Sequence, residues 1–380
     1  MRKKIYSILF LMSVGIPVGF AACEQHPCVM VIDAGSSGSR AHLYEYEKAE
    51  GNVPSVIQEL WSKKVNPGFS TLEARPEVIH QYIEQLLTGM PVAEKVPVYF
   101  YATAGMRLLP EASQQALYRV LKKEFKERSF AGQKSLSLVR AKTISGSDEG
   151  WFAWLTVNYQ RGTFNAQSQG SAGIMDIGGA STQIAFEVNP SMQSQSAAPM
   201  HELDTPSHHF TVSSTSFLGL GQNQVLNQIL DEPTCFSEGY PLSNGQQGQG
   251  DAAACAEHLR PLLNMHKVSQ TISLSQSQAS EWQMLGGASY FAQSPALQPY
   301  GYVWSSQALL NATQRHFCQS SWDSISMTDP KNTYLYAHCA LGSYYYSLLV
   351  NGYGFAGSET MTYYEQKYTG DWTLGVVFEL

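Results

Sequence analysis

Charged residues are scarce in this chain of 380 residues: only 14% are Asp, Glu, Lys or Arg, and 31 acidic residues outnumber 24 basic ones. The net charge of −7 argues against a nucleic acid as partner, because it gives no field to steer one in. A folded protein is expected, since 43% of the residues are hydrophobic and 12% aromatic. The chain is long for a single core, so two lobes are favoured. The acidic net charge favours a small molecule as ligand.

Long apolar runs are also missing, except at the N-terminus. Residues 1–22 place Arg2, Lys3 and Lys4 before a short apolar core and small residues, the order of a signal peptide. The core is too short for a membrane span of ~20 residues. We expect cleavage after Ala21 or Ala22, a secreted or periplasmic protein, and no transmembrane anchor in the mature chain. A lipid on Cys23 is the alternative, because "FAAC" loosely resembles a lipoprotein processing site.

The six cysteines form no CxxC pair and show no zinc spacing. In an oxidising compartment they are expected to form disulfides. We predict pairing between sequence neighbours: Cys23–Cys28, Cys235–Cys255 and Cys318–Cys339. A lipid on Cys23 would leave Cys28 without a partner, so the two interpretations exclude each other.

The known phosphate-binding loops are absent. No segment matches GxxxxGK[ST], and neither glycine-rich turn leads into a predicted helix, which excludes the dinucleotide fingerprint. Instead, one plan occurs twice, in "VMVIDAGSSGSRAHLYEYE" (29–47) and "IMDIGGASTQIAFEV" (174–188): a strand, an aspartate, a turn of small residues and a second strand. A single such turn could be an ordinary hairpin. Two copies favour phosphate binding, because backbone N–H groups in such turns bind phosphate oxygens.

The two strand-end aspartates suggest a metal. If the two strands end in facing lobes, Asp33 and Asp176 can hold a divalent cation through its water molecules, the usual mode for Mg²⁺ on a polyphosphate.

Two stretches between the turns carry further candidates. Arg107 follows a predicted strand and either contacts phosphate or makes a structural ion pair. In "ISGSDEGWFAWLTVNY" (144–159), Ser145 or Ser147 can cap a helix whose first turn contains Asp148 and Glu149. These acids either only complement the helix dipole, or the dipole keeps Glu149 ionised as a general base for water.

Together these motifs resemble those of the apyrases, the ecto-nucleoside triphosphate diphosphohydrolases. The stretches similar to that family's conserved regions are "DAGSSGSR", "ATAGMRLL", "SGSDEGWFAWLTVNY", "DIGGASTQIAF", "MLGGASYFAQ" and the final "NGYGF…GDWTLGVV". The resemblance implies an α/β fold of two actin-like, ribonuclease H-like lobes with a nucleotide cleft between them. It also implies metal-dependent hydrolysis of the terminal phosphate of nucleoside tri- and diphosphates.

The two-lobe interpretation gives boundaries. We expect a signal peptide at 1–22, lobe I at 23–145 completed by 365–380, and lobe II at 146–364. A monomer that binds nucleoside tri- and diphosphates is expected.

The resemblance implies a role for each matching residue. Glu149 looks like the general base, while Ser181 and Gln183 look like the groups that hold the attacking water. The water would attack the terminal phosphorus in line, without a phosphoenzyme. Asp33 and Asp176 resemble outer ligands of the cation, Mg²⁺ or Ca²⁺, with Mn²⁺ as a further candidate. The implied phosphate-binding residues are Ser36, Ser37, Gly38, Ser39, Arg40, Thr103, Gly178, Gly179 and Ala180.

The chain departs from the family pattern in two places. Animal members often have a histidine where Gly38 stands, and "MLGGASYFAQ" is a weak copy of an aromatic-rich original. Base recognition is thus less well supported than phosphate chemistry. Candidates for stacking on the base are Phe291, Tyr336 and Tyr344, each of which could instead be a packing or surface residue.

Two alternatives to an exported apyrase remain. One is an exopolyphosphatase of the same superfamily, which has comparable Asp-Gly turns; the predicted export, the disulfides and the Trp-rich helix speak against it. The other is a secreted nucleotide-binding protein with an inert cleft. The joint presence of Glu149, Ser181 and Gln183 argues against an inert cleft, since binding alone needs none of them.

Overall fold

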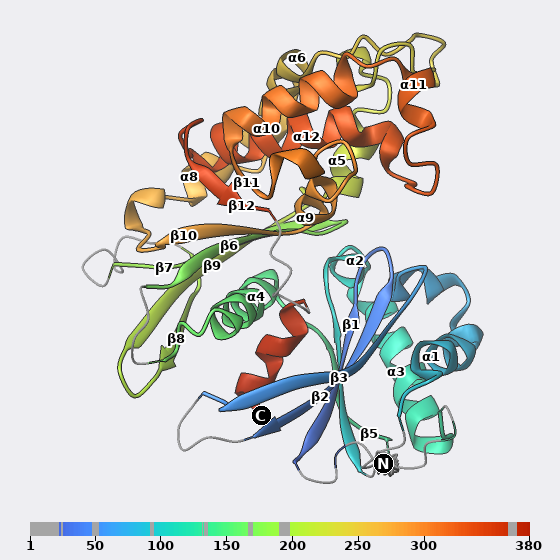
Figure 1. Cartoon of the computed structure of the whole chain (residues 1–380). Coiled ribbons are helices and arrows are strands. Elements are labelled where there is room, and N and C mark those ends of the chain that lie inside the picture. Colours follow the sequence, from blue (N-terminus) through green and yellow to red (C-terminus); the bar gives the residue numbers. More distant parts are fainter. Residues whose placement is uncertain are drawn as a thin grey trace, which may run out of the picture.

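Two β-sheets, each with its own helices, form the body of the protein (Figure 1). The computed structural model describes residues 23, 26–47, 53–91, 95–130, 132, 136–165, 170–189, 198–363 and 371–380. The predicted signal peptide lies outside the described residues. No described helix is long and apolar enough to cross a membrane.

The first sheet has five strands in the order β3-β2-β1-β4-β5. Their bounds are β1 Cys28–Ala34, β2 Ser39–Glu47, β3 Val56–Val65, β4 Val96–Ala102 and β5 Leu136–Thr143. The second sheet has seven strands in the order β11-β12-β10-β6-β7-β9-β8. Their bounds are β6 Ala172–Ile177, β7 Ser181–Glu187, β8 Met200–Asp204, β9 His209–Leu218, β10 Glu281–Gly286, β11 Val303–Ser305 and β12 Thr360–Thr362.

Helices separate and cover the sheets. The α-helices are α1 Ile79–Leu87, α2 Ala104–Arg107, α3 Glu111–Glu127, α4 Gly146–Gln160, α5 Gln222–Gln228, α6 Ala252–His258, α7 Arg260–Met265, α8 Val268–Thr271, α9 Gly287–Ala292, α10 Ser306–Thr313, α11 Trp322–Ser326 and α12 His338–Ser347. A 3₁₀ helix, η10 (Trp372–Glu379), ends the chain.

These layers enclose three hydrophobic cores. One lies between the first sheet and helices α1 and α3, a second lies between the two sheets around α4 and η10, and the third lies beneath the helices that cover the second sheet (Figure 1). Strand β1 contributes to two cores because its side chains alternate: Met30 and Ile32 face α1 and α3, whereas Val29 and Val31 face η10 and α4.

Helix α4 is buried almost from its start. Oγ of Ser145 accepts a hydrogen bond from the backbone N–H of Asp148 at 3.0 Å, and the Asp148 carboxylate accepts one from the N–H of Ser145. Of the two predicted cap residues, Ser145 and Ser147, Ser145 is the one that caps the helix, in a capping box. Every residue from Glu149 to Asn158 is buried, so the tryptophans of this helix are core, as expected.

The three predicted disulfides are confirmed: Cys23–Cys28, Cys235–Cys255 and Cys318–Cys339. The bond to Cys28 leaves no free thiol on Cys23 for a lipid. The predicted lobe boundary at residue 145 falls between β5 and α4. The second boundary, at 364–365, lies outside the described residues, so the division into lobes stays a prediction.

Candidate functional site

The two predicted strand–turn–strand units are present and face each other. β1 pairs antiparallel with β2 and β6 with β7, and each pair is joined by one of the short glycine-rich turns. A Cβ atom placed on Gly179 would lie 2.6 Å from Oγ of Ser36, so the turns nearly touch. A cavity of ≈ 460 Å³ opens between them.

The peptide groups of the second turn are oriented by the segment that precedes α5. The carbonyl oxygens of Gly178, Gly179 and Ala180 accept backbone hydrogen bonds from residues 219–224. In a planar trans peptide the N–H points away from the carbonyl oxygen. The N–H groups of Gly179, Ala180 and Ser181 therefore point away from these donors, and all three residues line the cavity.

Glycines allow close backbone packing behind both turns. A Cβ on Gly68 would lie 2.6 Å from the carbonyl oxygen of Gly35, and a Cβ on Gly221 would collide with the backbone of Gly179 and Ala180. A side chain at either position would push a turn into the cavity.

Most of the predicted site residues line this cavity. They are Asp33, Ser36, Ser37, Gly38, Arg40, Thr103, Glu149, Asp176, Gly178, Gly179, Ala180 and Ser181. Gln183 lies behind the wall, buried, and reaches the site through hydrogen bonds.

Ser39 does not line the cavity, contrary to expectation. Its hydroxyl accepts a hydrogen bond from the Tyr82 hydroxyl at 2.8 Å and is fully buried. The alternation of β2 explains this, because Ser39 shares the face of Ala41 and Leu43, which pack into the core under α1.

Glu149, Gln183 and Ser181 form one hydrogen-bonded group. The Nε2 atom of Gln183 donates to Oε2 of Glu149 at 3.1 Å and to Oγ of Ser181 at 2.7 Å. Arg107 also donates to Oε2 of Glu149. Of the two roles considered for Arg107, the structure places it in an ion pair, with Glu149.

Burial dominates the acidity of Glu149 and raises its pKa to about 7. The cation of Arg107 lowers that pKa, and the negative charge of Asp176 raises it. The helix N-terminus was expected to keep this carboxyl ionised. The cost of burying the charge outweighs that effect, so near neutral pH the group lies close to its midpoint.

The two strand-end aspartates lie on opposite sides of the cavity. Burial raises the pKa of Asp176 to about 6, and burial together with the charge of Asp371 raises that of Asp33 well above its usual range. The Oδ1 atom of Asp33 is buried and has no hydrogen-bond partner. Within the described ranges no three His, Cys, Asp or Glu side chains are close enough to hold a metal ion directly.

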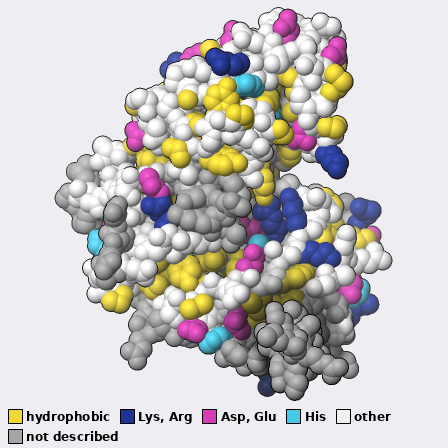
Figure 2. All heavy atoms as spheres, viewed as in Figure 1, with side chains coloured by type: hydrophobic (Ala, Val, Ile, Leu, Met, Phe, Trp, Pro, Cys, Tyr) yellow, Lys and Arg dark blue, Asp and Glu magenta, His cyan; other side chains and the backbone are white. Residues whose placement is uncertain are grey.

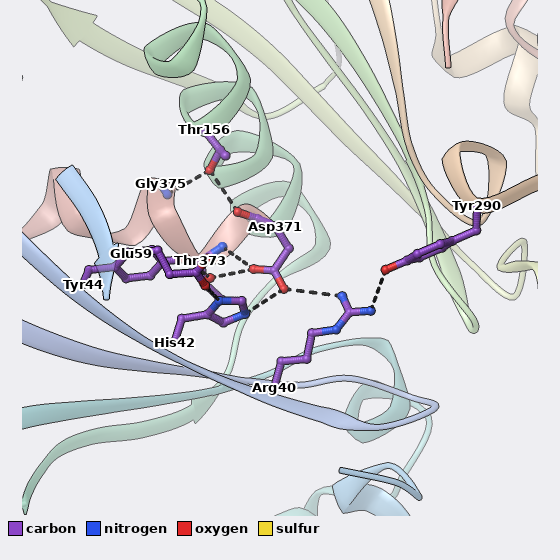
Figure 3. A network of polar contacts seen from close by, with 9 residues as sticks. All are labelled: Arg40, His42, Tyr44, Glu59, Thr156, Tyr290, Asp371, Thr373 and Gly375. Carbon is purple, nitrogen blue, oxygen red and sulfur yellow. Dashed lines mark hydrogen bonds and ion pairs between the residues drawn. The ribbon is translucent and has the colours of Figure 1, made fainter. Parts of the chain in front are cut away.

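Asp371, which the sequence analysis did not identify, lines the cavity and contacts both strand β2 and helix α4 (Figure 3). Its Oδ2 lies 3.2 Å from Nε2 of His42 and 3.6 Å from Nη1 of Arg40. His42 also contacts Glu59 at 2.5 Å, and the backbone carbonyl of Asp371 accepts a hydrogen bond from Thr156 of α4. Although burial alone would raise it, His42 and Arg40 hold the pKa of Asp371 well below its usual value.

The three aromatic residues proposed for base stacking do not line the cavity. Tyr344 is fully buried and its hydroxyl donates to the carbonyl of Leu220. Phe291 packs against Phe317, and Tyr336 stacks in a separate cluster. The residue type alone did not indicate whether each aromatic side chain faces the cleft or the core.

Tyr290 and Tyr334 line the cavity instead. Tyr290 is 63% exposed, and its hydroxyl accepts a hydrogen bond from Nη2 of Arg40 at 3.1 Å across the cleft. The hydroxyl of Tyr334 donates to Oδ1 of Asn223 at 2.9 Å. The neighbouring Gly286-Gly287 turn, within the motif already singled out, was a signal that could have identified Tyr290.

Basic side chains lie at the opening. Figure 2 shows a recess between the upper and lower parts of the molecule, with Lys and Arg side chains gathered on its lower margin. Arg40 and Lys64 are the Lys and Arg residues whose side chains line the cavity in the described part of the chain. A small anion would meet positive charge as it enters.

Comparison with known proteins gives a consistent picture. The model of the GDA1/CD39 (nucleoside phosphatase) family matches residues 21–380. Ectonucleoside triphosphate diphosphohydrolase 1 of Rattus norvegicus is 27% identical over 447 residues, covering 100% of this chain and 85% of the relative. Ectonucleoside triphosphate diphosphohydrolase 8 of Bos taurus is 28% identical over 413 residues, covering 92% of this chain and 82% of the relative.

Solved structures share the fold at low identity. A nucleoside triphosphate hydrolase from Neospora caninum superposes with a TM-score of 0.61 at 16% identity, over 86% of this chain and 85% of its own. A Ppx/GppA family member from Aquifex aeolicus gives 0.54 at 15% identity, over 93% and 97%. The predicted two-lobe, actin-like α/β fold is thereby confirmed.

Proposed function

The chain belongs to the GDA1/CD39 (nucleoside phosphatase) family, and from this premise we propose that it is a nucleoside triphosphate diphosphohydrolase. Its reaction is hydrolysis of the terminal phosphate of nucleoside tri- and diphosphates. The observation that carries the proposal is the meeting of two facing glycine-rich turns with the group formed by Glu149, Gln183 and Ser181 in one cavity. The names of the relatives, ectonucleoside triphosphate diphosphohydrolases, support the same activity.

The two turns bind the phosphate groups. The second turn offers the backbone N–H groups of residues that line the cavity, and Ser36, Ser37 and Thr103 offer hydroxyls from the other side. Because the turns are backed by tight backbone packing, these donors are fixed before substrate binds and cost no reorganisation in the transition state.

Asp33 and Asp176 fit a hydrated divalent cation, Mg²⁺ or Ca²⁺, with Mn²⁺ as a further candidate. The unpartnered Oδ1 of Asp33 is a buried acceptor that a metal-bound water would satisfy. Such a cation neutralises charge on the phosphate oxygens.

Glu149 acts as general base toward the attacking water. Ser181 Oγ and the amide of Gln183 hold that water beside the carboxylate, since all three groups share one hydrogen-bonded cluster. The water attacks the terminal phosphorus in line and its proton passes to Glu149, while the bond from that phosphorus to the bridging oxygen breaks and the shortened nucleotide leaves with the oxygen. A pKa of about 7 suits a base that works near neutral pH.

Tyr290 and Tyr334 hold the base of the nucleotide. They line the lobe II side of the cavity, and Tyr290 offers an exposed ring. They replace Phe291, Tyr336 and Tyr344 in this role.

The protein acts outside the cytoplasm, exported by the signal peptide at residues 1–22. Its three disulfides fit an oxidising compartment. Lobe I then comprises residues 23–145 with 365–380, and lobe II comprises 146–364.

An exopolyphosphatase is the second candidate, because the Aquifex aeolicus Ppx/GppA family member shares the fold. The discriminating experiment is phosphate release from ATP, ADP and inorganic polyphosphate by the purified mature chain with Mg²⁺. The proposal expects release from both nucleotides, loss of it with EDTA, and a reduction of at least ~10²-fold in Glu149→Ala, as for a general base.

Glu202→Gln, at an exposed position of β8 outside the cavity, is the matched control and should leave the rate unchanged. Release from polyphosphate alone would favour the exopolyphosphatase. Nucleotide binding without any release would indicate an inert cleft.

A further inference from the structure

Asp33, Arg40 and Lys64 form a row across three adjacent strands of lobe I. Asp33 of β1 pairs with Arg40 of β2, and Arg40 pairs with Lys64 of β3. Residues directly opposite one another on neighbouring strands present their side chains on the same face. All three line the cavity, so the row leads from a strand-end aspartate to a lysine near its opening.

The two cations of this row differ in their partners. The guanidinium of Arg40 is held by Asp371 on one side and by Tyr290 on the other (Figure 3). Lys64, by contrast, makes no ion pair with any carboxylate of the described residues. Partial burial and the charge of Arg40 both lower the pKa of Lys64. Of the two carboxyl groups beside these cations, Asp371 pairs with Arg40, and Asp33 makes no ion pair with Lys64, so the ammonium group of Lys64 can pair with an anion.

The absence of a side chain at Gly38 leaves room for Lys64 beside the first turn. A Cβ atom on Gly38 would lie 3.2 Å from Cε of Lys64 and 2.6 Å from the carbonyl oxygen of Val65. The end of the lysine side chain therefore lies against the last residue of the turn, in space that a larger residue would need. Its ammonium group can reach an anion bound by that turn.

We propose that Lys64 is a further substrate-binding residue, which pairs through its ammonium group with a phosphate of the nucleotide held at the first turn. This inference rests on the proposed function for its substrate. Lys64 lies on β3, whereas Glu149 lies on helix α4 with Arg107 and Gln183 as its partners. Lys64 therefore contributes to binding rather than to proton transfer. Charge-assisted hydrogen bonds to a partly exposed cation are worth about tenfold in affinity.

The test compares Lys64→Met with Lys63→Met. Lys63 is the neighbouring residue on the opposite face of β3, where its Nζ donates to the carbonyl of Thr88, so the control removes the same charge away from the cavity. We expect Lys64→Met to raise KM for ATP and ADP about tenfold with kcat within about twofold, and Lys64→Arg to restore most of the affinity. Lys63→Met should match wild type.

Ionic strength adds a readout that a merely structural role would not change. Wild-type KM should rise with added KCl, and the rise should be weaker in Lys64→Met, because one attractive charge is missing. An unchanged KM, or an equal effect of Lys63→Met, would overturn the proposal.

Binding of inorganic pyrophosphate, measured by calorimetry, separates this proposal from the proposed function. If wild type hydrolyses no nucleotide, the proposed function fails. The anion site still stands if wild type binds pyrophosphate and Lys64→Met binds it about tenfold more weakly. Equal pyrophosphate binding by the two proteins, or none by wild type, would refute the role of Lys64.

Discussion

Arg107 donates a hydrogen bond to Oε2 of Glu149, the oxygen that also accepts from Gln183. The proposed base is thus held by a cation from α2 and by an amide from β7. This contact stabilises the ionised form of a carboxyl group that burial would otherwise keep protonated. The working pH of the protein depends on the balance of the two effects.

The first prediction concerns pH. Because Glu149 must be ionised to accept a proton and its pKa lies at about 7, kcat/KM should rise about tenfold per pH unit below pH 7 and level off above it. The profile is measured from pH 5 to 9 at constant ionic strength and saturating Mg²⁺. A rate that is flat between pH 5 and 7 would contradict the assignment of Glu149 as the base.

Removal of Arg107 should move that profile. Arg107 lowers the pKa of Glu149, so Arg107→Met should shift the rising limb to higher pH by on the order of one unit. At pH 9 most of the activity should return if Arg107 acts mainly through Glu149. A loss of activity that is equal at every pH would instead indicate a direct contact of Arg107 with phosphate.

Asp33→Asn should remove activity and yet stabilise the metal-free protein. The pKa of Asp33 is raised in the fold, so its ionised form costs stability, and this cost grows as pH rises above the ordinary value of 3.8. Without metal at pH 7, we expect the free energy of unfolding of the variant to exceed that of wild type by about 1 kcal/mol, as measured by thermal unfolding. Mg²⁺ should stabilise wild type but not the variant. A less stable Asp33→Asn would refute this account.

His42→Gln should be destabilising, by about 3 kcal/mol, because it leaves Asp371 and Glu59 without their shared cation. Although burial lowers it, the two carboxylates raise the pKa of His42 to about 10, above the ordinary 6.5. The stabilisation is therefore complete below pH 6.5 and lost as pH rises to 10. Urea unfolding at pH 6, 8 and 10 should show a smaller decline in the variant.

His26→Gln is the matched control for that experiment, since His26 pairs with Glu47 at the surface, where both side chains are about two-fifths exposed. Its effect should stay below ~1 kcal/mol. Equal losses of unfolding free energy in the two variants would show that the buried network stabilises the fold no more than a surface ion pair does.

Tyr290→Leu tests recognition of the base. Stacking on an aromatic ring is worth about 1–3 kcal/mol per base, so KM for ATP should rise at least about fivefold. Inorganic tripolyphosphate has no base and should be hydrolysed with unchanged KM. Tyr290→Phe keeps the ring and should behave as wild type toward ATP. Equal effects on ATP and tripolyphosphate would assign Tyr290 to the phosphates through Arg40 instead.

Local patterns allowed much of the site to be predicted. The two turns, the Ser145 cap and the position of Glu149 all depend on residues within one short stretch, so composition and spacing were sufficient. The disulfides were also correct, since each joins sequence neighbours. Ser39 was wrongly predicted to bind phosphate because it was counted in the first turn. It is instead the first residue of β2, and its side chain points to the core.

Contacts between distant segments were not predictable. Asp371 meets His42 across 329 positions of the chain, and Tyr290 meets Arg40 across 250. No periodicity encodes such pairs, because they depend on where the C-terminal segment and helix α9 lie relative to strand β2. Lys64 was missed for a related reason: its importance follows from the strand register that sets it beside Arg40.

The order in which the cysteines pair bears on how the disulfides form. The first cysteine bonds with the second, the third with the fourth and the fifth with the sixth, at separations of 5, 20 and 21 residues. A chain that enters an oxidising compartment N-terminus first presents both members of a pair before the first member of the next. An oxidase that joins thiols in the order of their arrival would then produce the native pattern directly, with no wrong partner yet within reach.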